Sequence, residues 1–231
     1  MAYIDPAGNA FNDISSEAEI YLNDGNDSVD IINNVESFAY GGNGDDGVFY
    51  DGLAFAHLYG GQGNDYLAGG GNGDFLYGED GVDLLQAGSG NDLLEGGAGS
   101  DRLLAGAGRD RQIGGSGADT FEFHDAFEST RSTGRDVIRD FSTREGDQIH
   151  LSILDADPFT LELDHFKFIG SKGFADYHRR HPGDDSMLLR FDPRSHTLQG
   201  DTNHNFRLDS QDFVVKLVGV SHLNADDLIL V

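Results

Sequence analysis

The sequence predicts an all-β protein whose centre stacks into a parallel β-roll and is followed by a short antiparallel β-sheet or sandwich. Two observations predict the roll: the chain has 33 Gly and only 4 Pro among 231 residues, and the glycines concentrate in a nine-residue repeat. A third predicts the antiparallel region. After Phe123 glycine becomes scarce, and short segments with partial apolar and polar alternation are separated by polar turns.

The repeat begins at Gly60 and runs through seven consecutive blocks without a change of phase. The sixth place of every block is aspartate, and the eighth is apolar in six of the seven. A flexible glycine-rich linker would not keep this phase. The blocks read GGQGNDYLA, GGGNGDFLY, GEDGVDLLQ, AGSGNDLLE, GGAGSDRLL, AGAGRDRQI and GGSGADTFE.

Each block reads as a tight turn followed by a short strand. Glycines at the first, second and fourth places permit positive φ and close backbone approach, so the first six residues can form the turn. In the three-residue strand the eighth side chain faces the interior and its neighbours face outward. Two consecutive blocks then make one coil, and each coil buries its apolar row against the next.

Stacking aligns the aspartates in two columns, because turns on one edge come from blocks two apart. One edge holds Asp65, Asp83, Asp101 and Asp119, and the other holds Asp74, Asp92 and Asp110. Calcium prefers oxygen ligands and would relieve the repulsion between stacked carboxylates. We therefore expect Ca²⁺ between consecutive turns of an edge, about five ions in the regular blocks. Without the ions the roll should be largely unfolded.

A weaker form of the pattern precedes the regular blocks. Asp27 and Asp46 are each followed two residues later by valine, and the steps from Asp27 to Asp46 and on to Asp65 are each one residue longer than a double block. We expect irregular coils on the edge of Asp65, with opposite turns at 32–37 and 51–56 that lack the aspartate. These coils would raise the total to about seven ions. The predicted organisation is a cap at 1–21, irregular coils at 22–59, the regular roll at 60–122 and the antiparallel region at 123–231.

The blocks resemble the GGxGxDxUx nonapeptide of RTX (repeats-in-toxin) proteins. The resemblance implies a right-handed parallel β-roll, with the sixth-place aspartates as side-chain ligands and loop residues as carbonyl ligands. Asn72, Glu79, Arg109, Arg111 and Gln112 depart from the pattern, and the site of Asp110 departs most. The carbonyl ligands expected on one edge are those of Gly60, Gly63, Gly78, Gly81, Gly96, Gly99, Gly114 and Gly117.

The region after the repeats also resembles known sequences. GADTFEF followed by GRDVIRDFSTREGDQIHLS is similar to the segment behind the repeats of serralysin-type metalloproteases, whose antiparallel sheet packs against the last coil. The ending NADDLILV resembles the terminus that RTX proteins present to the type I secretion machinery, although a buried final strand explains it equally well. The N-terminus has no basic start and no apolar segment. We therefore expect type I export to an extracellular place, where calcium is abundant, or to the cell surface.

A second calcium candidate lies at 201–212. Asp201, Asn203, Asn205, Asp209 and Asp212 occupy places 1, 3, 5, 9 and 12 of a twelve-residue loop, which is EF-hand spacing. Phe206 stands where that loop normally has glycine, and Asp212 is shorter than the usual glutamate. A polar turn between two strands is the alternative interpretation.

Charge and missing motifs exclude several function classes. The chain has 15 Lys and Arg and 41 Asp and Glu, which gives a formal charge of −26. This charge excludes nucleic acid and anionic membrane surfaces as general partners. There is no Cys, no HExxH and no GxSxG, and we predict no enzyme. The predicted function is a secreted calcium-binding module that folds on binding Ca²⁺. The alternatives are a calcium-dependent adhesin or polysaccharide binder, the non-catalytic C-terminal part of a larger exoenzyme, and an unrecognised catalytic site.

Overall fold

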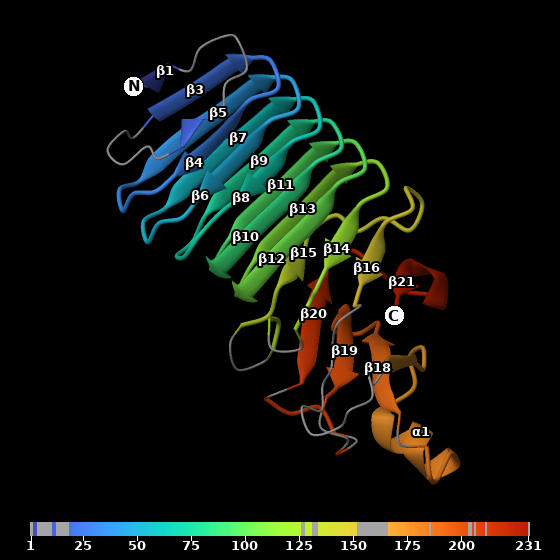
Figure 1. Ribbon diagram of the computed structural model, residues 1–231. Coiled ribbons are helices and arrows are strands. Elements are labelled where there is room, and N and C mark those ends of the chain that lie inside the picture. The colour runs from blue at the N-terminus through green and yellow to red at the C-terminus, as the bar shows by residue number, and fades with distance from the viewer. Residues whose placement is uncertain are drawn as a thin grey trace.

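The computed structural model shows a β-solenoid of stacked coils, followed by a small group of strands and one helix (Figure 1). Within its described residues, no helix is long and apolar enough to cross a membrane. The structure describes residues 2–3, 11–12, 19–125, 128–130, 134–151, 166–184, 186–202, 205, 207–210 and 212–230.

Two long sheets form the two faces of the roll. The first, in spatial order, contains β1 (Ala2–Tyr3), β3 (Glu19–Asp24), β5 (Ser37–Asn43), β7 (Ala56–Gln62), β9 (Phe75–Asp80), β11 (Leu93–Ala98), β13 (Arg111–Ser116), β15 (Val137–Ile138), β20 (Phe213–Leu217), β19 (Thr197–Asp201), β18 (Met187–Asp192) and β17 (Phe166–Phe168). The second contains β2 (Phe11–Asn12), β4 (Ser28–Ile31), β6 (Gly47–Tyr50), β8 (Tyr66–Ala68), β10 (Leu84–Gly90), β12 (Arg102–Gly108), β14 (Thr120–Glu122), β16 (Gln148–His150) and β21 (Leu228–Ile229).

The strand register reproduces the sequence period. Leu85 pairs with Leu67 on one side and with Leu103 on the other, each two blocks away, and all these strands are parallel. Upstream, Val48 pairs with Val29 and with Leu67, each one residue farther away than two blocks. In the coil of Val48 the additional residue lies in the turn between β6 and β7. Val48 pairs with Leu67 and His57 pairs with Phe75, but Val48 and His57 are one residue farther apart in the sequence than Leu67 and Phe75. The prediction of a parallel β-roll is confirmed.

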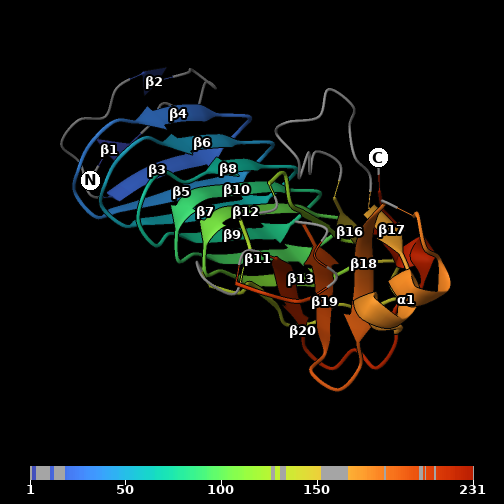
Figure 2. The same cartoon turned by 90° about the horizontal axis from the view of Figure 1, so that it is seen from below.

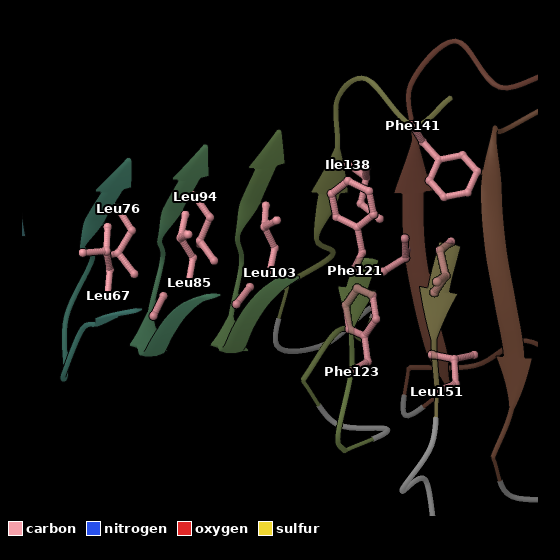
Figure 3. Packing of buried hydrophobic residues seen from close by; sticks show 14 of the residues in the cluster. Leu67, Leu76, Leu85, Leu94, Leu103, Phe121, Phe123, Ile138, Phe141 and Leu151 are labelled. Carbon is pink, nitrogen blue, oxygen red and sulfur yellow. The ribbon is translucent and has the colours of Figure 1, made fainter. Parts of the chain in front are cut away.

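The interior of the roll is a double row of apolar side chains, one from each sheet. Leu67, Leu85 and Leu103 of the second sheet and Leu76 and Leu94 of the first have no exposed surface (Figure 3). Burying one leucine contributes roughly 1.5–3 kcal/mol relative to leaving it in water. The rows therefore hold the coils together by the stacking that the repeat predicts.

The parallel coils continue past Glu122, where the sequence analysis placed the start of the antiparallel region. Strand β15 pairs in parallel with β13, and β16 pairs in parallel with β14. Ile138 and Ile149 extend the apolar rows, and neither is exposed. Strands β20 and β21 then add one further parallel strand to each sheet.

Antiparallel pairing is present where β18, β19 and β20 meet. These strands join the first sheet edge to edge through β20 and do not form a separate layer (Figure 2). Beside them, helix α1 (Phe174–Arg180) buries Phe174 and Tyr177 in a small cluster with Ile169 and Leu188. The helix was not predicted from the sequence.

The N-terminal end is only partly described. Strands β1 and β2 pair in parallel with β3 and β4. The cap predicted at 1–21 otherwise lies outside the described residues, and the cap stays a prediction. At the other end of the chain a short 3₁₀ helix, η1 (Ala225–Asp227), precedes the final strand.

Candidate metal centre

Eleven buried aspartates line the two edges of the roll, none of them more than 4 % exposed. Each occupies the same place in its coil, at the end of a turn and directly before a strand. We call the two groups the long column and the short column. The long column is Asp27, Asp46, Asp65, Asp83, Asp101, Asp119 and Asp147, and the short column is Asp74, Asp92, Asp110 and Asp136.

One contact repeats along both columns. After the first aspartate of each column, Oδ1 accepts a hydrogen bond from the backbone N–H of the aspartate in the preceding coil. In the long column Asp65 donates to Asp83 at 2.7 Å and Asp83 donates to Asp101 at 2.9 Å. In the short column Asp92 donates to Asp110 at 2.8 Å. These bonds use one carboxylate oxygen and fix the orientation of the other.

The second oxygen is buried and has no protein partner at most positions. Within the described part of the chain, Oδ2 accepts no hydrogen bond at Asp27, Asp46, Asp65, Asp83, Asp92, Asp101, Asp110, Asp119 and Asp136. A buried carboxylate oxygen without a partner costs free energy unless a cation or a donor reaches it. At Asp74 and Asp147, by contrast, Oδ2 accepts the N–H of Gly70 and of Ser142.

Backbone carbonyls face the same spaces. A methyl group built on Gly60 would lie 2.7 Å from the Gly78 carbonyl oxygen and would overlap Oδ2 of Asp65. A methyl group on Gly81 would overlap the Gly63 carbonyl oxygen. The gap between these two coils therefore gathers one carboxylate oxygen and carbonyls from both turns, and glycine is needed to leave the space open.

Most of the predicted carbonyl ligands likewise lie beside a glycine of the adjacent coil. Gly60 faces Gly41, and further along the column Gly81, Gly96, Gly99 and Gly114 face glycines of the adjacent coil. Gly117 lies beside the Gly99 carbonyl of the preceding coil. The carbonyl of Gly117 does not face a glycine of the next coil. Asp119 aligns with Asp147, so the residue of the next coil that aligns with Gly117 is Glu145.

Two turn residues that replace a glycine of the repeat keep the geometry of the turn. Asn72 and Glu79 adopt positive φ values of 70° and 76° at places where the repeat has glycine. Asparagine tolerates this region of backbone space, while glutamate does so at a cost of roughly 1–2 kcal/mol. The turns therefore form despite the substitutions.

Burial and crowding disfavour the charged form of these carboxylates. Burial, with a smaller contribution from carboxylates in adjacent coils and partial compensation by a backbone N–H, raises the pKa of Asp83 and of Asp92 to about 7. Burial and the carboxylate of Asp110 raise the pKa of Asp136 to about 9. A cation between the coils would favour the charged carboxylates and so lower these pKa values.

The donor set fits a hard divalent cation. All the converging atoms are carboxylate or carbonyl oxygens, which are the ligands that Ca²⁺ takes. Among the described residues, no three His, Asp or Glu side chains come together as a metal site. An ion in either column would therefore depend on backbone carbonyls for part of its coordination.

Asp136 and Asp147 were not identified by the sequence analysis. They stand 26 and 28 residues after their column neighbours, and their turns lack the glycine pattern. A signal was nevertheless present, since Ile138 and Ile149 follow them by two residues as the apolar residue follows each repeat aspartate.

The turns at 32–37 and 51–56 have Ser37 and Ala56 at the place of the column aspartate, and the N–H of Ala56 donates to Oδ1 of Asp74 at 2.8 Å. The Asn33 side chain accepts the N–H of Val35 and the hydroxyl of Ser37, and Asn34 accepts the N–H of Leu53 at 3.0 Å. The Tyr50 hydroxyl donates to the Val35 carbonyl at 3.2 Å. Asparagine, tyrosine and the first aspartate of the short column thus bind the turn backbone on this edge.

The loop at 201–212 connects β19 to β20, and its Asn203 lies outside the described residues. The Asp212 carboxylate accepts backbone N–H groups from Thr202 and Asp209, at 3.1 and 2.5 Å. Asn205 donates to Asp209 at 2.7 Å. These bonds describe a polar turn, and calcium at Asp201, Asn205, Asp209 and Asp212 stays a prediction.

Comparison with known families identifies the repeat. The family described as RTX calcium-binding nonapeptide repeat (4 copies) matches residues 57–85, 77–112 and 86–121. The chain contains RTX calcium-binding repeats. The RTX repeats thus cover the coils in which the sixth-place aspartates stack, and the central part of the chain is a calcium-binding β-roll module.

Two solved structures are similar over most of the chain. The AlgE6R3 subunit of the Azotobacter vinelandii mannuronan C5-epimerase is 29% identical, with 72% of this chain and 78% of that chain covered at a TM-score of 0.32. The AlgE6R2 subunit of the same enzyme is 24% identical, with 71% and 89% covered at a TM-score of 0.34. No curated protein sequence matches the chain. The assignment of the RTX repeats depends on the repeat itself.

Proposed function

We propose that the chain is an exported calcium-binding module whose β-roll folds when Ca²⁺ fills the gaps of the two columns. The observation that supports this most strongly is the row of buried Oδ2 atoms without a hydrogen-bond partner in the described chain. At Asp46, Asp65, Asp83 and Asp101 this oxygen and a carbonyl oxygen of the neighbouring turn lie beside the same glycine. Nine aspartates have such an Oδ2 atom, and their mutual repulsion opposes folding until a cation arrives.

The number of ions follows from the gaps. The regular RTX repeats offer about five gaps with an aspartate on both sides, and the coils of Asp27 and Asp46 extend the number to about seven. The gaps between Asp110 and Asp136 and between Asp119 and Asp147 are two further candidates, because the Oδ1 contact continues across them at 2.9 and 3.0 Å.

Export by a type I machinery fits this dependence on calcium. A chain that is unfolded without calcium stays extensible during passage and folds where millimolar calcium saturates weak sites. The RTX repeats and the acidic, then apolar, C-terminus support this proposal. We propose no catalytic role for the chain.

The experiment is a calcium titration by calorimetry, with far-ultraviolet circular dichroism at each step. We expect several ions per chain and a large gain of β signal. Asp83→Asn and Asp101→Asn should each lower the stoichiometry, since each removes a charge from a gap. Asp51→Asn, at an exposed turn position without a column contact, is the matched control. Equal stoichiometry in all four proteins would reject the column sites.

A further inference from the structure

Five cations gather around β13, β15 and β20 of the first sheet, on the strands and in the adjoining turns. One hollow of about 540 Å³ is lined by Arg109, Gly134, Arg135, Val137, Arg139, Lys216 and Val218. A second, of about 450 Å³, shares Arg109, Val137 and Arg139 and adds Arg111. We call Arg109, Arg111, Arg135, Arg139 and Lys216 the cationic patch. It contains a third of the 15 Lys and Arg of the chain.

The patch cations are not engaged with carboxylates. In the described part of the chain none of the four arginines forms a salt bridge, and Lys216 donates to the Ser195 carbonyl at 2.7 Å. No acidic side chain lines the larger hollow. In the second hollow the acidic residues are Asp92 and Asp110, whose carboxylates belong to the short column. The patch is therefore positive in a chain of formal charge −26.

The patch lies in a straight row across the sheet, which continues beyond Lys216 to Thr197 and Asp192. Residues in register on successive strands, from β9 to β20, are Phe75, Leu93, Arg111, Val137 and Lys216. The row runs at right angles to the strands and along the axis of the roll (Figure 1). With strands about 4.8 Å apart, it is a linear track on which apolar and cationic side chains alternate toward the patch.

The row continues away from the patch as a ladder of rings. Phe75 stacks on His57 at 4.6 Å between ring centroids, and His57 stacks on Phe38 at 4.3 Å. The neighbouring row stacks Tyr40, Tyr59 and Tyr77 at 4.9 Å. The outer face is thus aromatic toward the N-terminal end of the roll and cationic toward its C-terminal end, with the exposed Glu95 of β11 in register with Tyr77 between the two parts.

We propose that this face binds a linear acidic polysaccharide, with its carboxylates on the cationic patch and its sugar rings along the apolar and aromatic row. Arginine pairs with carboxylates through two parallel hydrogen bonds, and several such groups at regular intervals match an anionic chain along the track. The strands of the track are paired on both sides, so a peptide cannot add to them as a further strand. The net charge of −26 opposes a nucleic acid, whose charge density is high.

The inference rests on the proposed function in one respect. The second hollow borders Asp92 and Asp110, and calcium in the short column would cancel their negative charge beside the patch. The binding assay is therefore run at a fixed, saturating calcium concentration, and each variant is first titrated with calcium alone.

The experiment measures binding of polygalacturonate oligomers of increasing length by calorimetry. The test variant is Arg111→Gln, Arg139→Gln and Lys216→Gln combined, whose side chains lie outside the aspartate gaps. The control is Lys172→Gln, Arg179→Gln and Arg180→Gln combined, which removes the same charge from the exposed surface at α1. Sulfated dextran, neutral dextran and a single-stranded oligonucleotide are the competing ligands.

We expect micromolar to millimolar binding that strengthens with oligomer length and weakens at least about tenfold in the test variant, with a smaller loss in the control. Binding of sulfated dextran alone would overturn the assignment to carboxylates. Equal weakening in both variants would show a general charge effect and overturn the proposal, as would binding of neutral dextran or a preference for the oligonucleotide. Normal calcium stoichiometry in a chain that binds no polyanion would reject this inference and leave the proposed function intact.

Discussion

Asp83 and Asp65, two blocks apart in the sequence, are joined by a hydrogen bond of 2.7 Å from the backbone N–H of Asp65 to Oδ1 of Asp83. The bond orients the Asp83 carboxylate so that its Oδ2 faces the adjacent turn without a partner from the described chain. The fold therefore builds its candidate metal sites from backbone register. Any change that disturbs the stacking of turns disturbs the sites as well.

The metal-free protein should become more stable as the pH falls. The folded-state pKa of Asp83 and Asp92 is about 7, and that of Asp65 and Asp119 is about 6, all above the ordinary value of 3.8. A raised aspartate pKa favours the folded state below the unfolded pKa, and this stability is lost as the pH rises through 6 to 7. Circular dichroism and urea unfolding of the calcium-free protein at pH 4.5, 6 and 8 check the direction. A calcium-free protein that is most stable at pH 8 would contradict the raised values.

Gly99→Ala should destabilise the calcium-loaded roll by about 2 kcal/mol or more. Gly99 has a φ of 146°, and a methyl group there would overlap the carbonyl oxygen of Gly81. Gly173→Ala is the control, since nothing lies within 4 Å of its added carbon and its φ is −74°. Urea unfolding in saturating calcium measures both. Similar losses in the two variants would show that the turn does not require glycine.

Gln112→Leu should stabilise the roll by roughly 1–3 kcal/mol. Gln112 is fully buried in the apolar row between Leu94 and Ile138, and within the described chain its amide atoms have no hydrogen-bond partner. Leucine restores the residue type that most other blocks have at this place. The control is Gln62→Leu, at an exposed position of β7. Unfolding at one calcium concentration compares the two, and destabilisation by Gln112→Leu would mean that the amide has a role.

Asp136→Asn should lower the calcium stoichiometry by one ion and leave the RTX repeats folded. Its Oδ2 is buried without a partner from the described chain, and its Oδ1 accepts the N–H of Asp110. Asparagine keeps the shape and removes the charge. Calorimetry gives the ion count, and circular dichroism shows whether the roll persists. An unchanged count would remove the gap between Asp110 and Asp136 from the candidate sites.

The repeat makes the roll and most of its candidate sites predictable from the sequence. The phase between aspartate and the apolar residue two places later predicts both the coil and its buried row, as Leu67 and Leu85 show. The coils of Asp136 and Asp147 were not predicted. These residues follow their column neighbours by 26 and 28 residues, so the repeat does not give their register, which depends on contacts between coils.

The C-terminal strands show the same limit. The segment around Phe213–Leu217 reads as a strand in the sequence, but its parallel pairing with β15 on one side and its antiparallel pairing with β19 on the other are set by tertiary contacts. The residues of the cationic patch are likewise distant in sequence, since Arg111 and Lys216 come into one row only through Val137 of β15, which pairs with both.

Calcium titration of the chelated protein, followed by calorimetry and circular dichroism together, tests the central claim most directly. We predict little β signal at neutral pH before calcium is added, and about five or more bound ions at the point where the signal is complete. A chelated protein that is already compact and rich in β structure, or one that binds fewer than about three ions, would contradict it.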